Sequence, residues 1–208
     1  MKYYPVYLSL KGHRVLVVGA GEVAFQKLRA LLDAGARVHV VSPQALPEIR
    51  QLAQDGKIEW SARPYKKTDT AGIRLVIAAT PDAILQKKIS QEARRRGIWA
   101  NVVDVPTLCD FIAPAVFGRG DIQIAISTGG AAPALAKYLR RKLESLIGPE
   151  YEEFVDVVQK LRPDILKLPK EKRRTLWERI VSDDFFQEIR IGGMAAAESR
   201  LRKWVYGR

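Results

Sequence analysis

The residues best suited to do chemistry begin with a glycine-rich turn near the start of the chain. Residues 19–24 read GAGEVA, which is the pattern G-x-G-x-x-A. Between a strand and a helix, the first glycine permits a tight turn and the second lets a pyrophosphate approach the backbone, while the small final alanine lets the helix pack closely on the strand. The pattern predicts a dinucleotide site; the alternative is a Rossmann-like turn that binds nothing. The residues expected to contact the cofactor are Gly19, Gly21, Glu22 and Val23.

The ribose end of this predicted site lacks its usual acidic residue. A Rossmann fold generally carries Asp or Glu about 20 residues after the glycine turn, whereas this chain has Ser42 and Pro43 there. A serine hydroxyl can hydrogen-bond a ribose or a 2′-phosphate, so the spacing leaves both NAD and NADP open. Arg37 is interpreted as a solvated basic residue rather than a 2′-phosphate clamp.

Three further polar residues follow or end predicted strands. Ligands of doubly wound sheets bind beyond the carboxyl ends of the strands, so we expect Thr80 and Asn101 in the cofactor site. Asp104 ends the apolar run 98–103. A carboxylate near the nicotinamide can accept a proton or hold a cationic centre, which makes Asp104 the candidate catalytic residue. The alternative is that Asp104 caps the turn that follows.

A second glycine-containing turn precedes a predicted helix later in the chain. Its residues are Ser127, Thr128, Gly129 and Gly130, and Pro133 stands at the expected first turn of the helix. Backbone N–H groups at a helix N-terminus suit a carboxylate or phosphate, so the turn is a candidate substrate-binding segment. Ordinary N-capping by one of the two hydroxyls is the alternative.

The elements that must position these residues alternate between strand and helix. Apolar β-branched runs and helical apolar spacing predict a parallel sheet covered on both faces. Strands are expected at 14–18, 37–41, 58–62, 75–79 and 99–103, with helices at 22–34 and about 82–96.

The pattern changes after Asp104. Two strand-like runs around a turn at 118–121 predict a hairpin, and amphipathic spacing predicts a helix at 133–147. The remainder reads as helical and strandless, with candidate breaks at Pro163, Pro169 and Gly192-Gly193. A two-stranded hairpin alone is marginal and leaves edges to be paired, which favours a homodimer.

The amino-acid composition and charge of the chain indicate which classes of partner it can attract. The chain has 208 residues, 47% of them apolar, and a net charge of +12. The excess is uneven, because residues 1–149 hold 22 basic and 12 acidic side chains while residues 150–208 hold 13 and 11. Such a field attracts polyanions, either nucleic acid or a small substrate rich in carboxylates or phosphates.

Other features of the sequence argue against a resident metal ion and against a membrane-spanning segment. The soft ligands His13, His39 and Cys109 lack ligand spacing, so we expect no resident metal and interpret both histidines as structural. A single cysteine cannot form an internal disulfide, the N-terminus lacks a signal-peptide core, and apolar runs stay far below the ~20 residues that cross a bilayer. We therefore expect a cytoplasmic protein that binds no membrane.

Taken together, the motifs resemble precorrin-2 dehydrogenase, the first module of siroheme synthase. The resemblance runs in order from about residue 5 to residue 147. The segments that carry it are 19–24 with Lys27, 79–80, 101–104, 111–115 and 127–130 with Pro133.

The resemblance implies a Rossmann-like NAD-binding domain at 1–113, a dimerisation region at 114–148 and a helical C-terminal domain at 149–208, assembled as a homodimer. It also implies NAD-dependent oxidation of precorrin-2 to sirohydrochlorin and, in many members, insertion of Fe²⁺ as a second activity. Asp104 matches the aspartate implicated in both reactions. Some members carry a phosphorylated serine where this chain has Thr128.

Two other functions remain open on the residues alone. One is a different NAD(P)-linked dehydrogenase that acts on another acidic substrate. The other is an NAD-sensing or nucleic-acid-binding module, supported by the glycine turn and the positive charge. Against nucleic acid, the chain shows neither a helix-turn-helix pattern nor basic strands interleaved with aromatic residues.

Overall fold

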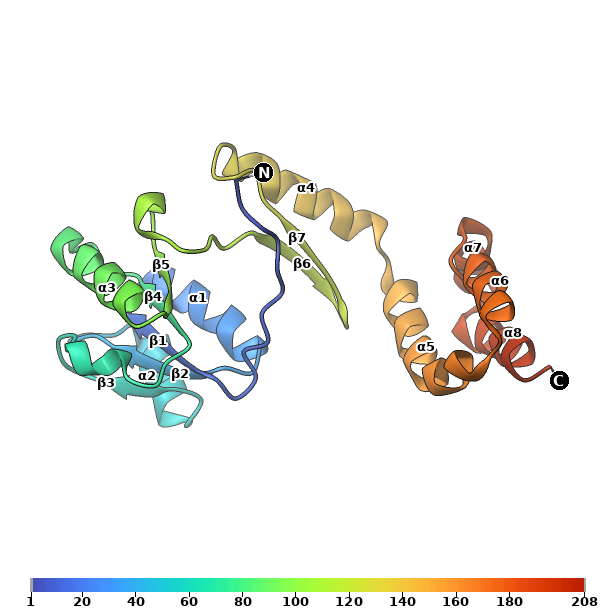
Figure 1. Cartoon of the computed structure of the whole chain (residues 1–208), viewed down its shortest axis with the longest axis horizontal. Coiled ribbons are helices and arrows are strands. Elements are labelled where there is room, and N and C mark those ends of the chain that lie inside the picture. The colour runs from blue at the N-terminus through green and yellow to red at the C-terminus, as the bar shows by residue number, and fades with distance from the viewer. Residues whose placement is uncertain (1, 208) are drawn as a thin grey trace. The chain divides into compact units, whose positions relative to one another are not determined.

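The computed structural model describes residues 2–207. The chain forms two compact units, one that ends at Ala113 and one that begins at Pro114 (Figure 1). Each unit has its own core and is described by itself below.

The first unit is built on five parallel strands in the order β3-β2-β1-β4-β5 (Figure 1). The strands are β1 (Arg14–Val18), β2 (Arg37–Val41), β3 (Glu59–Ser61), β4 (Leu75–Ala78) and β5 (Trp99–Val102). From Val15 to Val18, β1 is at most 3% exposed. Such continuous apolar runs are typical of parallel strands that are covered on both faces.

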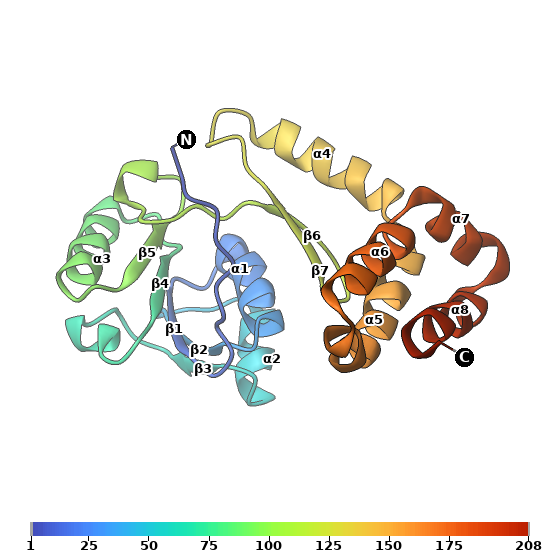
Figure 2. The same cartoon turned by 45° about the vertical axis from the view of Figure 1, so that its right-hand side comes forward.

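Helices cover both faces of this sheet (Figure 2). On one face, α1 (Glu22–Asp33) and α2 (Pro47–Gln54) place Leu28 and Ile49 in the core that contains Val17. On the other face, α3 (Ala83–Arg95) places Ile89 against Leu16. The predicted Rossmann-like sheet is confirmed.

Three short elements of the first unit were not predicted from the sequence. They are α2 and the 3-10 helices η1 (Lys67–Thr70) and η2 (Pro106–Leu108). Ile49 is the buried residue of α2, and each 3-10 helix is a single turn. All three are shorter than the window of about 11 to 18 residues over which helical periodicity is read, so they were not identified.

The second unit begins with an antiparallel hairpin of β6 (Ala115–Arg119) and β7 (Ile122–Ile126). The prediction of a hairpin is confirmed, but the predicted turn at 118–121 is wrong. Gly118 and Arg119 pair with Gln123 and Ile122, so the chain reverses at residues 120–121. Gly120 has φ +52°, the left-handed conformation that a two-residue hairpin turn requires.

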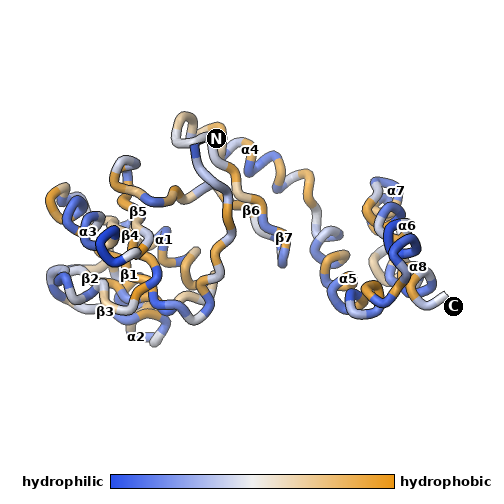
Figure 3. Tube along the Cα trace, viewed as in Figure 1, coloured by the Kyte–Doolittle hydropathy of each residue, from blue (hydrophilic) through white to orange (hydrophobic). Residues whose placement is uncertain are grey.

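Five helices complete the second unit. They are α4 (Pro133–Leu146), α5 (Pro149–Lys167), α6 (Lys170–Ile180), α7 (Asp183–Gly192) and α8 (Met194–Tyr206). Helices α5 to α8 share one apolar core, and Figure 3 shows hydrophobic stretches alternating with hydrophilic ones along them. The helical tail is therefore confirmed, as are the breaks at Pro169 and Gly193.

The predicted break at Pro163 is wrong. Pro163 lies inside α5, although a proline there removes one helical hydrogen bond and crowds the preceding turn. Leu161 and Ile165 on either side of it are 2% and 0% exposed. Burial of these two side chains keeps the helix continuous through the proline.

No helix within residues 2–207 is long and apolar enough to cross a membrane.

Candidate functional site

The carboxyl ends of the central strands lie in register at one edge of the sheet. Val18 of β1 pairs with Val41 of β2 and with Ala78 of β4, and Ala78 pairs with Val102 of β5. The strand order reverses between β1 and β4, which is where doubly wound sheets open a ligand crevice. The candidate residues Gly19, Ser42, Thr80 and Asp104 follow these strands, and Asn101 is the last residue but one of β5.

Gly19 packs directly on the end of β4. Its φ is +104°, and an added Cβ would lie 2.1 Å from the carbonyl oxygen of Ala79. The Gly19 N–H donates to the Val41 carbonyl at 3.0 Å. This bond extends the hydrogen bonding between β1 and β2 by one residue beyond the end of β1. Only glycine fits this position.

Gly21 faces open space instead. It is the N-cap of α1, no described side chain caps that helix, and an added Cβ would meet nothing within 4 Å. Glu22 and Val23 are exposed, while Ala24 is fully buried against the sheet. Backbone N–H groups at the start of α1 are therefore accessible, and the turn fits a pyrophosphate.

The main chain of Ser42 is fixed by β3. Its N–H donates to the carbonyl of Ser61 at 3.3 Å, and its carbonyl accepts the indole N–H of Trp60 at 3.1 Å. Ser42 is half-buried and Pro43 is exposed. Both hydrogen bonds use main-chain atoms of Ser42, and its hydroxyl takes part in neither.

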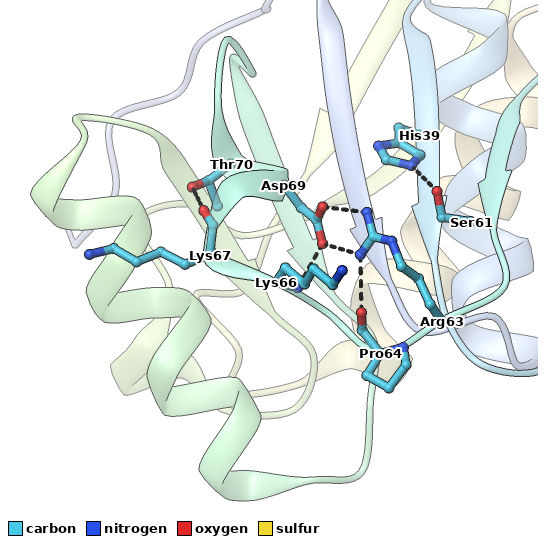
Figure 4. A network of polar contacts seen from close by, with 8 residues as sticks. All are labelled: His39, Ser61, Arg63, Pro64, Lys66, Lys67, Asp69 and Thr70. Carbon is cyan, nitrogen blue, oxygen red and sulfur yellow. Dashed lines mark hydrogen bonds and ion pairs between the residues drawn. The ribbon is translucent and has the colours of Figure 1, made fainter.

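Polar contacts fasten η1 to the segment that follows β3, and a separate contact joins β2 to β3 (Figure 4). Arg63 donates to both carboxylate oxygens of Asp69 at 2.6 and 2.9 Å, and the Lys66 N–H donates to one of them at 2.7 Å. Hydrogen bonding to Arg63 lowers the pKa of Asp69. His39 Nε2 lies 2.9 Å from the Ser61 hydroxyl, and burial lowers the pKa of the imidazole. These contacts give His39 and Arg63 structural partners.

Thr80 lies where β4 leads into α3. Its hydroxyl accepts the Asp82 N–H at 3.3 Å, and its carbonyl accepts the side-chain amide of Gln86 at 2.7 Å. Asp82 in turn caps α3 by accepting the N–H of Ile84 at 2.9 Å. The loop that carries Thr80 is thereby held at the carboxyl edge.

Asn101 is 8% exposed and lies within β5. Its side-chain amide donates to the carbonyl of Phe111 at 3.0 Å. This amide therefore holds the loop that follows β5, a contact that no pattern in the sequence indicates. Its expected role in cofactor binding stays a prediction.

Asp104 is exposed and has an unusual backbone conformation. Its φ is +62°, and it is the one non-glycine residue with positive φ within 2–207. It occupies the third position of a turn that the Val105 N–H closes on the Val102 carbonyl at 3.2 Å. The next helix, η2, has no side-chain cap. Non-glycine residues in this conformation are often found at functional sites, where the surrounding structure holds them.

Sequence reasoning missed the loop that supports this turn. Cys109 contacts the backbone of Val102 and Val105, and burial raises the pKa of its thiol. The carboxylate of Asp110 accepts the N–H of Ala100 at 3.0 Å. No periodic pattern marks these residues, because they act through the path of an irregular loop.

The other candidate segment, Ser127 to Gly130, lies in the second unit. The Ser127 hydroxyl accepts the Gly129 N–H and the Thr128 hydroxyl accepts the Ala132 N–H, both at 3.0 Å. An added Cβ at Gly129 or Gly130 would meet nothing within 4 Å. The two hydroxyls thus close the turn before α4, while both glycines border open space.

Residues 2–207 contain no group of three or more His, Cys, Asp or Glu side chains arranged to hold a metal ion.

Three family models match the chain in order. The "Putative NAD(P)-binding" family matches residues 6–115, "Sirohaem biosynthesis protein central" matches 119–146, and "Sirohaem synthase dimerisation region" matches 150–204. Over residues 6–115, more than half of its length, the chain belongs to the NAD(P)-binding family. The resemblance inferred from the motifs is confirmed, and the expected cofactor is confirmed at the level of an NAD(P)-binding domain.

Individual relatives agree with this family. Siroheme synthases of Pseudomonas aeruginosa and Pseudomonas fluorescens are 40% and 41% identical over 209 residues, which is 100% of this chain and 45% of theirs. The chain therefore spans about half the length of these relatives. A solved structure named "SirC, precorrin-2 dehydrogenase" superposes with a TM-score of 0.78 at 24% identity, covering 99% of this chain and 100% of that one. That likeness shows a shared fold.

Proposed function

We propose that the chain oxidises precorrin-2 to sirohydrochlorin with NAD as the hydride acceptor. The observation that carries the proposal is an exposed carboxylate, Asp104, held at positive φ beside the switch point of an NAD(P)-binding sheet. The names of the full-length relatives and of the SirC structure point to the same chemistry. Consumption of NAD fits the cytoplasmic location expected from the sequence.

The glycine turn would hold the cofactor. Backbone N–H groups of Glu22 and Val23 at the start of α1 would bind the pyrophosphate, and the open space beside Gly21 would admit it. Ser42 and Pro43 would lie near the adenosine ribose, and Thr80 and Asn101 would complete the site. When bound, NAD accepts the hydride.

Asp104 would receive the proton. Oxidation of precorrin-2 formally removes a hydride and a proton, so a carboxylate that faces the macrocycle serves as the acceptor or as an orienting charge. Insertion of Fe²⁺ into sirohydrochlorin releases two pyrrole protons, and the same carboxylate would accept them one at a time, passing the first to solvent before it takes the second. In this second reaction Fe²⁺ is a substrate rather than a resident metal.

The acidic macrocycle would be attracted by the positive charge of the chain. Residues 1–149 carry most of that excess, with 22 basic and 12 acidic side chains. The backbone of Gly129 and Gly130, which border open space beside Ser127 and Thr128, would bind one of the carboxylates. Charge of this kind raises the rate of encounter more than it fixes orientation.

The protein would act as a homodimer. In the second unit, Val116, Leu135 and Tyr138 are 51%, 48% and 53% exposed. The match of residues 150–204 to a dimerisation region supports association through the helical tail. The exposed apolar residues of the hairpin and α4 would extend the same interface.

The direct test is anaerobic incubation with precorrin-2 and NAD, followed by Fe²⁺ or Co²⁺, with absorption spectra recorded at each stage. We expect NADH and the sirohydrochlorin spectrum to appear together, and the metallated product after the metal is added. Binding of NAD with no change in the precorrin-2 spectrum would instead favour a dehydrogenase for another acidic substrate.

A further inference from the structure

The contacts beneath Asp104 converge on the side chain of Cys109. Its Sγ lies 3.1 Å from the Val102 carbonyl oxygen and 3.4 Å from that of Val105, and either oxygen can accept the thiol proton. The sulfur also accepts the Val102 N–H at 3.1 Å. Val102 and Val105 are the first and last residues of the turn that carries Asp104. One thiol therefore joins both ends of that turn.

Other backbone hydrogen bonds fix the turn to its neighbours: the Val103 N–H donates to the Ala78 carbonyl and the Leu108 N–H to the Val105 carbonyl, both at 3.0 Å, but neither joins the two ends of the turn. Asp104 has φ +62°, a conformation that residues with a Cβ adopt at a cost. A single backbone hydrogen bond, Val105 N–H to Val102 carbonyl at 3.2 Å, closes the turn. Asp104 itself is exposed, so packing does not hold its side chain.

Cys109 is itself fixed against β5. The next residue, Asp110, pairs with Ala100 twice: its N–H donates to the Ala100 carbonyl at 2.8 Å, and its carboxylate accepts the Ala100 N–H at 3.0 Å. Burial raises the pKa of the Cys109 thiol, so the group stays protonated at neutral pH and keeps its proton to donate. These features suit a hydrogen-bond donor rather than a nucleophile.

We propose that Cys109 is a positioning residue, which holds the Asp104 turn so that the carboxylate stays at the carboxyl edge of the sheet for proton transfer. The inference rests on the proposed function, because Asp104 matters for turnover only if that function is right. Cys109 acts through the backbone and forms no bond with the substrate.

The experiment compares Cys109→Ala, Cys109→Ser and Ser90→Ala in the precorrin-2 oxidation assay. Ser90 is the matched control, because it is fully buried and its hydroxyl donates to the Leu108 carbonyl of the same loop at 2.9 Å, away from the turn. We expect Cys109→Ala to lower kcat about 10-fold with the KM for NAD unchanged, since a small misplacement of a reacting group is costly. Cys109→Ser should recover most of the rate, and Ser90→Ala should keep it.

A double-mutant cycle with Asp104→Asn separates positioning from general damage. If Cys109 acts through Asp104, Cys109→Ala should cause no further loss of kcat in the Asp104→Asn background. Equal losses of kcat in Cys109→Ala and Ser90→Ala would overturn the proposal, as would independent losses in the cycle.

Hydrogen exchange at the Val105 amide gives a readout that needs no substrate. We expect faster exchange at this amide in Cys109→Ala than in the native chain or in Ser90→Ala. Unchanged exchange would overturn the inference even where precorrin-2 is turned over. Faster exchange in a protein that does not oxidise precorrin-2 would refute the proposed function and leave the support of the turn by Cys109 established.

Discussion

The parallel sheet of the first unit and the β6–β7 hairpin of the second are both made of short strands, yet they bury their residues very differently. In β1, residues 15–18 are at most 3% exposed, whereas in the hairpin only Phe117 is buried among the described residues. The sheet is covered by helices of its own chain. The hairpin is contacted by α4, yet Val116 stays 51% exposed and no third strand joins the hairpin among the described residues. We propose that a second copy of the chain covers it.

The largest effect should come from Gly19→Val in the first unit. A Cβ there would lie 2.1 Å from the Ala79 carbonyl oxygen, and the positive φ adds strain. We expect the first unit to unfold, with a loss above about 4 kcal/mol, while the separate core of α5 to α8 keeps its helices. Thermal unfolding followed by circular dichroism measures this, and Gly21→Ala, which has open space, is the control. If the first unit of Gly19→Val unfolded at the same temperature as in the native chain, the close packing of Gly19 on Ala79 would be contradicted.

Next in size is Gly21→Asp, which leaves the sheet intact and alters only the cofactor turn. The new carboxylate would stand where the pyrophosphate approaches, and repulsion between like charges at that range should weaken NAD binding by about 10²-fold. Calorimetric titration with NAD measures the affinity, with Gly21→Ala again as control. A folded Gly21→Asp variant that still reduces NAD at the native rate would show the placement to be wrong.

A smaller effect is expected at the hairpin. Light scattering should give about twice 23.3 kDa for the native chain. Val116→Glu introduces a charge on a half-exposed strand residue and should weaken association by about 10-fold or more. The matched control is Ile84→Glu in α3, which is 83% exposed but lies in the first unit. A native chain that is monomeric and fully active at micromolar concentration would show that the hairpin needs no second copy to cover it.

The smallest effect concerns the polar contacts that fasten η1 to the segment that follows β3. Asp69 has a folded-state pKa below its ordinary value because Arg63 hydrogen-bonds to it, so the pair stabilises the fold above about pH 4 and loses this effect as the pH falls through the folded pKa. Asp69→Asn should therefore lower Tm slightly at pH 7, and the difference should shrink in acid. A difference that stays constant from pH 7 to pH 3 would show that the charge of Asp69 contributes nothing.

The same contrast explains how much could be predicted from the sequence. The bounds of β1 and β2 follow from apolar runs, and the glycine turn follows from its motif, because both are local patterns. The sequence pattern does not mark the start of β6, because apolar residues run from Phe111 across the boundary between the two units, and Phe111 itself packs on the first core. The support beneath Asp104 depends on how an irregular loop folds back on β5, and no spacing in the sequence encodes that path.

The measurement that tests the account most directly is the effect of Asp104→Ala and Asp104→Asn on precorrin-2 oxidation, with NAD affinity determined on the same samples. Asparagine tolerates positive φ, so it removes the charge while it keeps the turn. We expect near-normal NAD affinity and a loss of turnover of about 10²-fold or more in both variants. Lost NAD binding with unchanged turnover per bound cofactor would contradict it, and would make Asp104 a structural residue of the turn.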